Sequence, residues 1–345
     1  MTSFTKNTLN ALQVSGYSIN IFSKLKYVAS SERSIGPNDV MIKIIAAGLN
    51  PIDYKMISGI MRLVGKNPSP PYILGFDLAG IVLKTGDKVT DFAPGDEVYS
   101  KVPWEQIGTV CLTTVVRADM VAKKPKNISF IEAAGIPLVG CSVYDSFQLF
   151  DLKPNSSILI HAGSGGIGSF AIQYAKYLGA YVYTTTSTNN VSWVNELGAD
   201  RVIDYKNEDY LNVVRNVDMV YDTLGGKYTR EAIKVVKKGG AIVSIAGHHD
   251  DETLKQLKVN TLVRLLFKIK GAFLLLRMRS KNIRYKHVWT YACKQTLDSI
   301  TALIEKGHIK PIVDRVYAFE KSVEALRYLR TNRAKGKVII EVNKE

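Results

Sequence analysis

Residues 161–176 read "HAGSGGIGSFAIQYAK", and four glycines fall within the six positions from 163 to 168. The short apolar stretch "SSILIHA" (156–162) precedes them, and apolar residues at helical spacing follow as far as Gly179. Gly163, Gly165 and Gly168 match GxGxxG between a strand and a helix, which is typical of a dinucleotide-binding turn. The alternative is a tight strand–helix connection that holds no ligand.

The three glycines of this pattern have separate physical reasons. Gly163 permits a tight turn, Gly165 leaves space for a pyrophosphate to approach the backbone, and Gly168 lets the helix pack closely on the strand. The first turn of the helix then offers free N–H groups and the positive end of its dipole to the phosphates. We therefore expect a dinucleotide at this turn, almost halfway along the chain.

Strands and helices alternate after the turn. A helix is expected at 191–198, where Gly198 closes it, and short β-branched stretches predict strands at 181–187, 201–205, 217–226 and 240–247. Alternation of this kind predicts an α/β fold, with a doubly wound parallel sheet of the Rossmann type and helices on both faces.

The rest of the chain follows other patterns. Before residue 125, stretches such as "FAPGDEVYS" (92–100) place turn residues ahead of short strands, which predicts a small barrel-like or sandwich-like domain. Residues 129–150 are expected to be helical, with Ser129 as N-cap and Glu132 three residues on. The C-terminal part is expected to hold a helix from near Ala292, the stretch 309–319, a further helix and the terminal strand 336–342.

Length and composition set the class of protein. The chain has 345 residues, 46% hydrophobic and 22% charged, as expected for an ordinary globular protein of about two domains. Its three cysteines are far apart and include no CxxC motif, which indicates a reducing, cytoplasmic environment. The first residues lack the apolar core of a signal peptide, and no apolar run is long enough to span a membrane.

The formal net charge of +15 is concentrated in one segment. From Thr253 to Leu297 the chain has eleven Lys or Arg and no Asp or Glu. Within it, "TLVRLLFKIKGAFLLLRMRSK" (261–281) is both apolar and cationic, which fits an anionic membrane surface. No nucleic-acid-binding motif accompanies the charge. We favour a helix followed by a strand at 269–276, buried in a sheet or a dimer seam, because such apolar runs usually belong to the core.

The end of the second predicted strand carries hydroxyl and amide groups. In NAD-binding proteins an acidic side chain about 20 residues after the turn holds the ribose 2′-OH. Here "TTTSTNN" (184–190) occupies that place, and no acid lies between Gly163 and Glu196. A carboxylate would repel a 2′-phosphate, whereas hydroxyls and amides can donate hydrogen bonds to it. We therefore predict NADP(H) rather than NAD(H); the alternative is an ordinary polar loop.

Several motifs occur in the order of a known family. They are "LNPIDYK" (49–55), "GFDLAGIV" (75–82), "PGDEVY" (94–99), "AAGIPLVGCSVY" (133–144), "HAGSGGIG" (161–168), "YDTLGG" (221–226) and "GKVII" (336–340). Over nearly its whole length the chain resembles the medium-chain dehydrogenase/reductase superfamily. It is most similar to the zinc-free quinone oxidoreductase and alkenal/enone reductase branch, which includes the chloroplast-envelope quinone oxidoreductase homologues and the reticulon-4-interacting protein group. The resemblance implies a GroES-like β-rich catalytic domain at 1–129 and 286–345, and a Rossmann NADP(H)-binding domain at 130–285.

The residues do not suggest a zinc site. Zinc alcohol dehydrogenases of the superfamily carry a catalytic Cys and a Gly-His-Glu motif, whereas Gly75 is followed here by Phe76 and Asp77. The three cysteines and five histidines do not have the spacing of a tetrahedral zinc site. Without zinc to stabilise an alkoxide, hydride delivery to a quinone or an electron-poor alkene is easier, because the carbonyl of that substrate delocalises the charge.

The resemblance implies a reaction and a substrate class. We expect NADPH-dependent hydride transfer to a quinone, or to the activated C=C of an enone or enal, with protonation by solvent or a nearby group. The substrate would be small, hydrophobic and electrophilic, between walls formed by loops such as 58–71 and 248–290. Related enoyl-thioester reductases place a Tyr proton donor in the loop after "NPxD"; this chain has Ile60 and Met61 there, so the donor stays open.

The resemblance also implies the residues of the site. Asn50, Tyr54 and Lys55 would face the substrate. Ser142 would lie near the nicotinamide carboxamide, and Ser187 and Tyr205 near the 2′-phosphate, with Lys206 close by. The full set expected to bind the cofactor is Ser142, Gly163, Ser164, Gly165, Gly166, Ile167, Gly168, Thr186, Ser187, Asn190, Tyr205, Thr223, Ala246 and Lys337.

Two other interpretations stay open. One is an NADP(H)-binding protein with little catalysis that binds a membrane surface or a partner protein, and the other is a structural relative that binds no cofactor. We expect a homodimer, because edge strands such as 269–276 often pair across a two-fold axis in this family.

Overall fold

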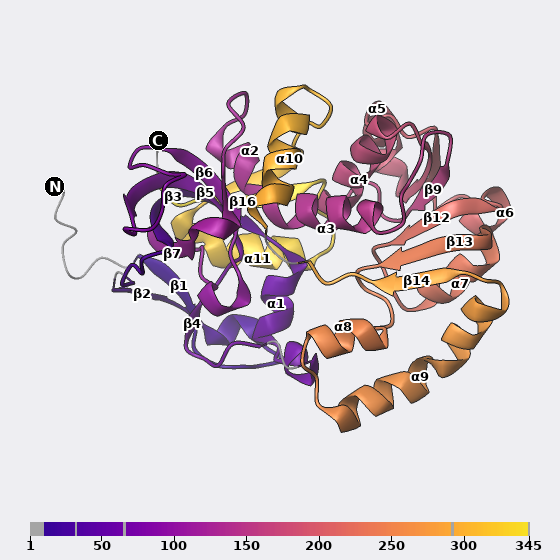
Figure 1. The fold of residues 1–345 in the computed structure, drawn as a ribbon, viewed down its shortest axis with the longest axis horizontal. Coiled ribbons are helices and arrows are strands. Elements are labelled where there is room, and N and C mark those ends of the chain that lie inside the picture. Colours follow the sequence, from indigo (N-terminus) through magenta and orange to yellow (C-terminus); the bar gives the residue numbers. More distant parts are fainter. Residues whose placement is uncertain (1–9, 32, 65–66, 291–292, 344–345) are drawn as a thin grey trace.

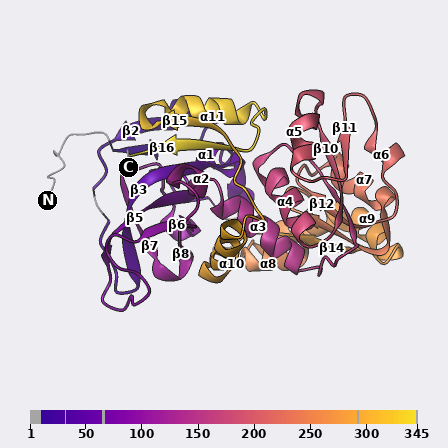
Figure 2. The ribbon, with the colours of Figure 1, turned by 90° about the horizontal axis from the view of Figure 1, so that it is seen from above.

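The computed structural model describes residues 10–31, 33–64, 67–290 and 293–343. Within these ranges the strands form one sheet of six strands, one of seven and one of three. The six-stranded and seven-stranded sheets occupy separate halves of the molecule, with α3 (Pro137–Gln148) lying between them (Figures 1 and 2). Residues 1–9, where no signal peptide is expected, and Ala292, the expected helix start, lie outside the described ranges.

The six-stranded sheet is parallel throughout, in the order β11-β10-β9-β12-β13-β14. This is the strand order of a Rossmann fold, so the predicted α/β class is confirmed. Ligands of such sheets bind outside the carboxyl ends of the strands where the order reverses, here between β9 and β12. The strands are β9 (Ser157–Ile160), β10 (Tyr181–Thr186), β11 (Arg201–Asp204), β12 (Val217–Asp222), β13 (Val236–Ser244) and β14 (Arg284–His287).

Helices cover both faces of this sheet because its strands are apolar on both sides. In β9, Ile158 and Ile160 pack into the core beneath α3 and α4, whereas Leu159 points to the opposite core beneath α7 and α9. The helices of this half are α4 (Gly166–Tyr177), α5 (Val191–Glu196), α6 (Tyr210–Val213), α7 (Lys227–Val235), α8 (Asp251–Gln256) and α9 (Thr261–Ser280).

The seven-stranded sheet is built around β3, which pairs antiparallel with β5, β7 and β16. β16 comes from the C-terminus, so residues far apart in sequence share this sheet. Its strands are β3 (Asp39–Leu49), β5 (Asp77–Thr85), β6 (Glu97–Lys101), β7 (Thr113–Arg117), β8 (Val121–Lys123), β15 (Val313–Ala318) and β16 (Lys337–Glu341). The small sheet contains β1 (Ala11–Val14), β2 (Leu25–Val28) and β4 (Tyr72–Ile73), and the helices nearby are α1 (Pro51–Ile57), α2 (Phe130–Ala134), α10 (Lys294–Glu305) and α11 (Ser322–Arg330).

The predicted capping box at Ser129 is confirmed. Ser129 Oγ accepts from the Glu132 N–H at 3.3 Å, and the Glu132 carboxylate accepts from the Ser129 N–H at 2.8 Å. The helical stretch expected at 129–150 is divided into α2 and α3 at Gly135. Pro137 starts the second helix, because proline lacks an N–H and fits the first helical turn.

The prediction of a strand at 269–276 is wrong. These residues lie inside α9, a continuous helix that Asn260 caps by accepting from the Leu262 N–H at 2.9 Å. Gly271 and Met278 are buried while Ile269 and Phe273 are exposed, a pattern of helical rather than alternating period. β14 is the outermost strand of the six-stranded sheet on this side. The predicted domain boundary between residues 285 and 286 falls within this strand. A dimer seam cannot therefore be a strand at 269–276.

None of the helices in the described ranges is both long and apolar enough to cross a bilayer.

Candidate active site

A cleft of about 420 Å³ opens at the carboxyl ends of β9, β12, β13 and β14. The six-stranded half contributes one wall, formed by Ala162, Gly165, Gly166, Ile167, Gly168, Thr223, Leu224, Ile245, Ala246, Val288, Trp289 and Thr290. The other half contributes residues that include Asn50, Lys55, Phe76, Lys101, Trp104 and Lys337. Its size and mainly apolar walls are typical of a small-molecule site. The loop at 58–71, expected as a wall, contributes none of the described lining residues.

The glycine turn lies at the base of this cleft and differs from expectation at one position. The left-handed conformation falls on Ala162 (φ 55°) and not on Gly163. Gly163 is needed for close packing, since a Cβ there would lie 2.3 Å from Thr184 Oγ1. At Gly168 a Cβ would lie 2.2 Å from the carbonyl oxygen of Ala162, so α4 packs directly on the turn. At Gly165 the nearest atom to a Cβ is that same oxygen, at 3.4 Å.

The first turn of α4 has no side-chain cap, because its N-cap residue is Gly165. Its N–H groups are therefore available to an anion in the cleft. The Gly336 N–H donates to the carbonyl oxygen of Ser164 at 3.0 Å, which fixes the turn against the segment before β16. This donor set fits the pyrophosphate of a dinucleotide.

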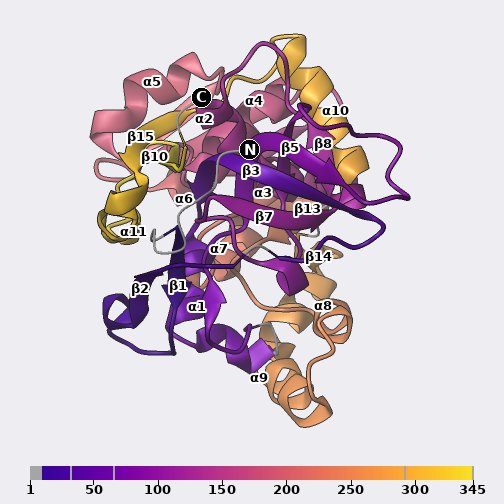
Figure 3. The same cartoon turned by 90° about the vertical axis from the view of Figure 1, so that its left-hand side faces the viewer.

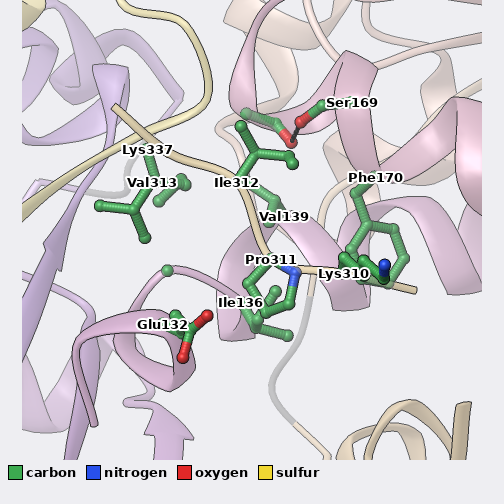
Figure 4. Close-up of a pocket in the computed structure, with 12 residues that line it drawn as sticks. Glu132, Ile136, Val139, Ser169, Phe170, Lys310, Pro311, Ile312, Val313 and Lys337 are labelled. Carbon is green, nitrogen blue, oxygen red and sulfur yellow. Dashed lines mark hydrogen bonds between the residues drawn. The ribbon is translucent and has the colours of Figure 1, made fainter. Parts of the chain in front are cut away.

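A second cavity lies behind the turn, between α2, α3, α4 and residues 310–313 (Figure 4). The side chains of Ser169 and Phe170 from α4 face Pro311 and Ile312 across it. Its volume of about 10 Å³ holds at most one water molecule, so it has no room for a nicotinamide or a substrate.

Three buried polar side chains meet on the floor of the main cleft. Lys337 Nζ donates to Asn50 Oδ1 and lies 3.4 Å from Asp77 Oδ2. Asn50 Nδ2 donates to Asp77 Oδ2 at 2.9 Å, and Asp77 Oδ1 accepts from the Leu138 N–H at 3.0 Å. Burial lowers the pKa of Lys337 and raises the pKa of Asp77, while the opposite charge of each opposes the shift of the other.

Lys55 and Tyr54 lie on α1 at the edge of the cleft. Lys55 lines the cleft, and partial burial there lowers the pKa of its ammonium group. Tyr54 does not line it; its hydroxyl donates to Asn332 Oδ1 at 3.4 Å, and Asn332 is a lining residue. The structure thus brings Asn50 and Lys55 together in the cleft and sets Tyr54 behind them.

The predicted cofactor residues fall into two groups. Those that line the cleft are Ser142, Gly165, Gly166, Ile167, Gly168, Thr223, Ala246 and Lys337. Ser142 Oγ lies 2.5 Å from Thr290 Oγ1, and Thr223 Oγ1 donates to the carbonyl oxygen of His161 at 2.8 Å. Gly163 and Ser164 belong to the turn itself, outside the lining.

The second group lies at the ends of β10 and β11, where Thr186 pairs with Asp204. Asn190 Nδ2 donates to Ser187 Oγ at 3.1 Å. Tyr205 is 55% exposed, and Lys206 Nζ lies 5.5 Å from the centroid of its ring. The hydroxyl of Thr186 is buried and has no hydrogen-bond partner among the described residues. This group is outside the cleft lining.

Two family models match the chain. Residues 36–128 match an alcohol dehydrogenase GroES-like domain, and residues 197–340 match a zinc-binding dehydrogenase. Over 317 residues the chain is 33% identical to the 2-methylene-furan-3-one reductase of Solanum lycopersicum, covering 89% of this chain and 72% of that protein. The chain belongs to the medium-chain dehydrogenase/reductase superfamily.

Other members of the superfamily are similar to a comparable degree. The NADPH-dependent alkenal/one oxidoreductase of Arabidopsis thaliana is 32% identical, covering 89% of this chain and 72% of that protein. The quinone oxidoreductase structure from Coxiella burnetii has a TM-score of 0.82 at 27% identity, covering 97% of this chain and 99% of that one.

One matching family model is named for zinc, but the described residues around the cleft do not form a donor set for that ion. In the described residues, no three His, Cys, Asp or Glu side chains lie close enough together to hold a metal. Asp77, two residues after Gly75, is hydrogen-bonded to Asn50 and the Leu138 N–H and lies beside Lys337. We assign no step to a metal.

Three aromatic side chains, Phe76, Trp104 and Trp289, form a wall of the cleft that was not among the predicted site residues. Trp104 packs edge-on against Phe76 with centroids 4.8 Å apart, and stacks on Trp289 at 5.5 Å. Lys101 lies over the Phe76 ring with Nζ 5.7 Å from its centroid, and burial lowers the pKa of that ammonium group. No local motif marks these residues. Only the expectation that residues 248–290 wall the substrate site includes Trp289.

Proposed function

We propose that the chain is a reductase that transfers hydride from NADPH to a quinone or to the activated C=C of an enone or enal. One observation carries the proposal: the glycine turn and the Asn50–Lys55 pair face the same largely apolar cleft. The names of the similar proteins, a 2-methylene-furan-3-one reductase and an NADPH-dependent alkenal/one oxidoreductase, support the same class.

The hydrogen-bond donors of the glycine turn indicate how the cofactor would bind. The N–H groups of the first turn of α4 would hold the pyrophosphate, and Ser142, Thr223 and Ala246 would lie along the nicotinamide. The nicotinamide supplies the hydride when it is bound. Lys337 supports this arrangement indirectly, because it fixes Asn50 through the hydrogen bond on the cleft floor.

We propose NADPH as the preferred cofactor, held at its 2′-phosphate by Thr186, Ser187, Asn190 and Tyr205. The absence of an acid at the end of β10 and the nearby Lys206 support this preference. Asp204 lies on the neighbouring strand, but its two oxygens already accept from the Lys206 N–H at 3.1 Å and Asn207 Nδ2 at 2.6 Å. The ratio of kcat/KM for NADPH and NADH measures the preference, and a higher value for NADH would contradict it.

The substrate side of the cleft consists of cations and aromatic rings. Lys55 would stabilise the negative charge that develops on the substrate oxygen, and Asn50 would help to orient the substrate. Tyr54 would be a positioning residue, since it does not line the cleft and its hydroxyl donates to Asn332, which does. Phe76, Trp104 and Trp289 exclude water and bind flat, conjugated molecules.

We further propose that the reaction needs no zinc. The polar side chains on the cleft floor, Asn50, Asp77 and Lys337, already bind one another, which supports this proposal. A homodimer remains our expectation, although its seam is not a strand at 269–276, and sedimentation velocity tests it. The free state of Cys111, Cys141 and Cys293 supports a reducing, cytoplasmic environment.

The decisive experiment is a screen of NADPH oxidation with alkenals, enones, quinones and enoyl thioesters, run with and without a chelator. Turnover of a quinone or an enone that survives chelation is expected. Binding of NADPH by thermal shift without turnover of any acceptor would favour the NADP(H)-binding protein with little catalysis. No thermal shift with NADPH would favour the structural relative that binds no cofactor.

A further inference from the structure

The outer face of α9 is apolar along its whole length. The exposed side chains are Leu262, Leu265, Leu266, Ile269, Phe273 and Leu276, each between 51% and 73% exposed. At 100° per residue all six fall within an arc of about 100°, which places them on one stripe of the helix. Isolated exposed apolar residues are ordinary, but a continuous stripe of six indicates an interaction surface.

The opposite face of α9 packs against the body of the protein. Met278 is buried with Leu274 against the core beneath the six-stranded sheet, and Val263 and Phe267 pack against a smaller core cluster. Gly271 faces His248 so closely that a Cβ would lie 1.9 Å from its Nε2. The inner face therefore holds the helix against the protein, and the apolar side chains of the outer stripe are not needed for this packing.

The position of α9 leaves this stripe accessible. In Figure 1 the helix runs along the lower edge of the molecule, and in Figure 3 it extends below the rest of the chain. In both views no other element of the described chain lies on its outer side.

Cations border the stripe on both sides. At 100° per residue, Lys270 and Arg277 fall on one flank, and Lys268 and Arg279 fall on the other. The helix contains no Asp or Glu, and the basic segment 253–297 around it contains none either. Of the four flanking cations, only Lys268 has an ion-pair partner in the described residues, namely Asp251.

We propose that α9 is a membrane-docking helix that lies flat on a bilayer containing anionic phospholipids. The apolar stripe would enter the boundary between headgroups and acyl chains, and the flanking Lys and Arg would reach the phosphates beside it. Since five Lys or Arg lie within the helix, it docks at the surface and does not span the bilayer.

A second copy of the chain fits the same face less well. Two such helices packed stripe to stripe would bring the flanking cations of both copies together with no acid in either helix to pair with them. An anionic lipid surface matches both the apolar stripe and the charge.

Docking through α9 would also bring the cleft close to the bilayer. Trp289 packs against the same small cluster as Val263 and Phe267, and it also lines the cleft. A hydrophobic acceptor dissolved in the membrane would then have a short path to the active site. The docking itself does not depend on the proposed reaction.

The test is co-sedimentation of the whole chain with vesicles of phosphatidylcholine, or of phosphatidylcholine mixed with phosphatidylserine. We expect binding to the anionic vesicles that weakens as NaCl is raised. The double variant Leu266→Gln/Phe273→Gln keeps good helix formers and should lower the partition coefficient by about tenfold or more. Its matched control, Ile19→Gln/Leu149→Gln, removes two apolar side chains that are 90% and 52% exposed elsewhere and should leave binding unchanged.

The charge contribution has its own pair of variants. Lys270→Glu/Arg277→Glu should lower binding to anionic vesicles by about tenfold or more, whereas Lys84→Glu/Lys88→Glu makes the same change in net charge on another surface and should have little effect. Equal losses in both charge variants, or no binding by the wild-type chain, would overturn the proposal. So would a dimer in sedimentation velocity that Leu266→Gln/Phe273→Gln dissociates while vesicles are not bound, since the face would then belong to a second copy.

Discussion

Lys337 donates a hydrogen bond to the amide oxygen of Asn50, although 287 positions separate the two residues in sequence. The bond joins the start of β16 to the residue before α1, and both residues line the cleft. The C-terminal return of the chain therefore completes the floor of the cleft.

The first prediction concerns this buried lysine. In Lys337→Met the carboxylate of Asp77 stays buried but loses its nearby positive charge, so the free energy of unfolding should fall by roughly 3–5 kcal/mol. Urea denaturation of the two proteins measures the difference. Lys335→Met removes an exposed lysine two residues away and should change stability by less than about 0.5 kcal/mol. Equal losses in the two variants would show that the ion pair contributes nothing.

The second prediction separates two glycines of the turn. Gly165→Ala should leave the thermal midpoint nearly unchanged, because its Cβ meets only one atom, at 3.4 Å. The same Cβ projects where the pyrophosphate would approach, so the Kd for NADPH should rise by about tenfold or more. Gly168→Ala should instead lower stability by about 1–3 kcal/mol, because its Cβ would overlap the Ala162 carbonyl oxygen.

Cofactor fluorescence titration and thermal melts together measure this pair. If Gly165→Ala binds NADPH as tightly as the wild type, the pyrophosphate does not bind at this turn. The fold itself should be unaffected, because a Cβ at Gly165 would make only an ordinary van der Waals contact, with the Ala162 oxygen at 3.4 Å.

The elements that sequence predicted well are those whose signal is local. The GxGxxG turn, the capping box at Ser129 and the alternating strands each lie within a short stretch and follow from backbone geometry. The sheet order could also be expected once a Rossmann turn was accepted. The strand prediction at 269–276 fails because α9 has apolar residues on both its buried and its exposed face, so the run lacks the polar face that normally marks a helix.

The candidate site was predicted only in part, because the cleft is formed by contacts across the chain. The motifs at 49–55 and 161–168 pointed to its two sides. Trp104 and Trp289 stack on each other from distant segments, and no local pattern reports such a pair. The buried Lys101 likewise follows from the packing of β6 against Phe76, which the sequence alone does not display.

The third prediction concerns the pH dependence that Asp53 introduces. Asp53 is fully buried beside Asp77, Lys337 and Tyr72; its Oδ2 accepts from the Asn50 N–H at 2.7 Å, and its Oδ1 has no partner in the described residues. Burial raises its pKa from 3.8 to about 7. Between these values the folded state binds more protons than the unfolded state, so this group lowers the free energy of unfolding as pH rises from about 4 to 7.

Asp53→Asn should remove that contribution and keep an acceptor for the Asn50 N–H. Its stability relative to the wild type should therefore increase by a few kcal/mol between pH 4 and pH 7 and stay level above. Urea midpoints at several pH values measure this difference. A difference that does not vary with pH would mean that Asp53 is ionised in the folded protein as it is in the unfolded chain.

The fourth prediction tests Lys55 as the group that stabilises negative charge on the substrate. Lys55 lines the cleft, where desolvation lowers the pKa of its ammonium group, and the largely apolar surroundings strengthen its interaction with a developing oxyanion. Lys55→Met should lower kcat by roughly 10²-fold with the preferred acceptor. The Kd for NADPH should change by less than about twofold, because an interaction made mainly in the transition state leaves cofactor binding unaffected.

Two further variants distinguish this role from a structural one. Lys55→Arg keeps the positive charge and should retain more of kcat than Lys55→Met. Lys26→Met removes an exposed lysine outside the cleft and should behave as the wild type. If Lys55→Met has an unaltered kcat, or if Arg restores none of the loss while both variants melt like the wild type, Lys55 has no part in stabilising the charge, and Lys101 becomes the remaining cation of the aromatic wall to test.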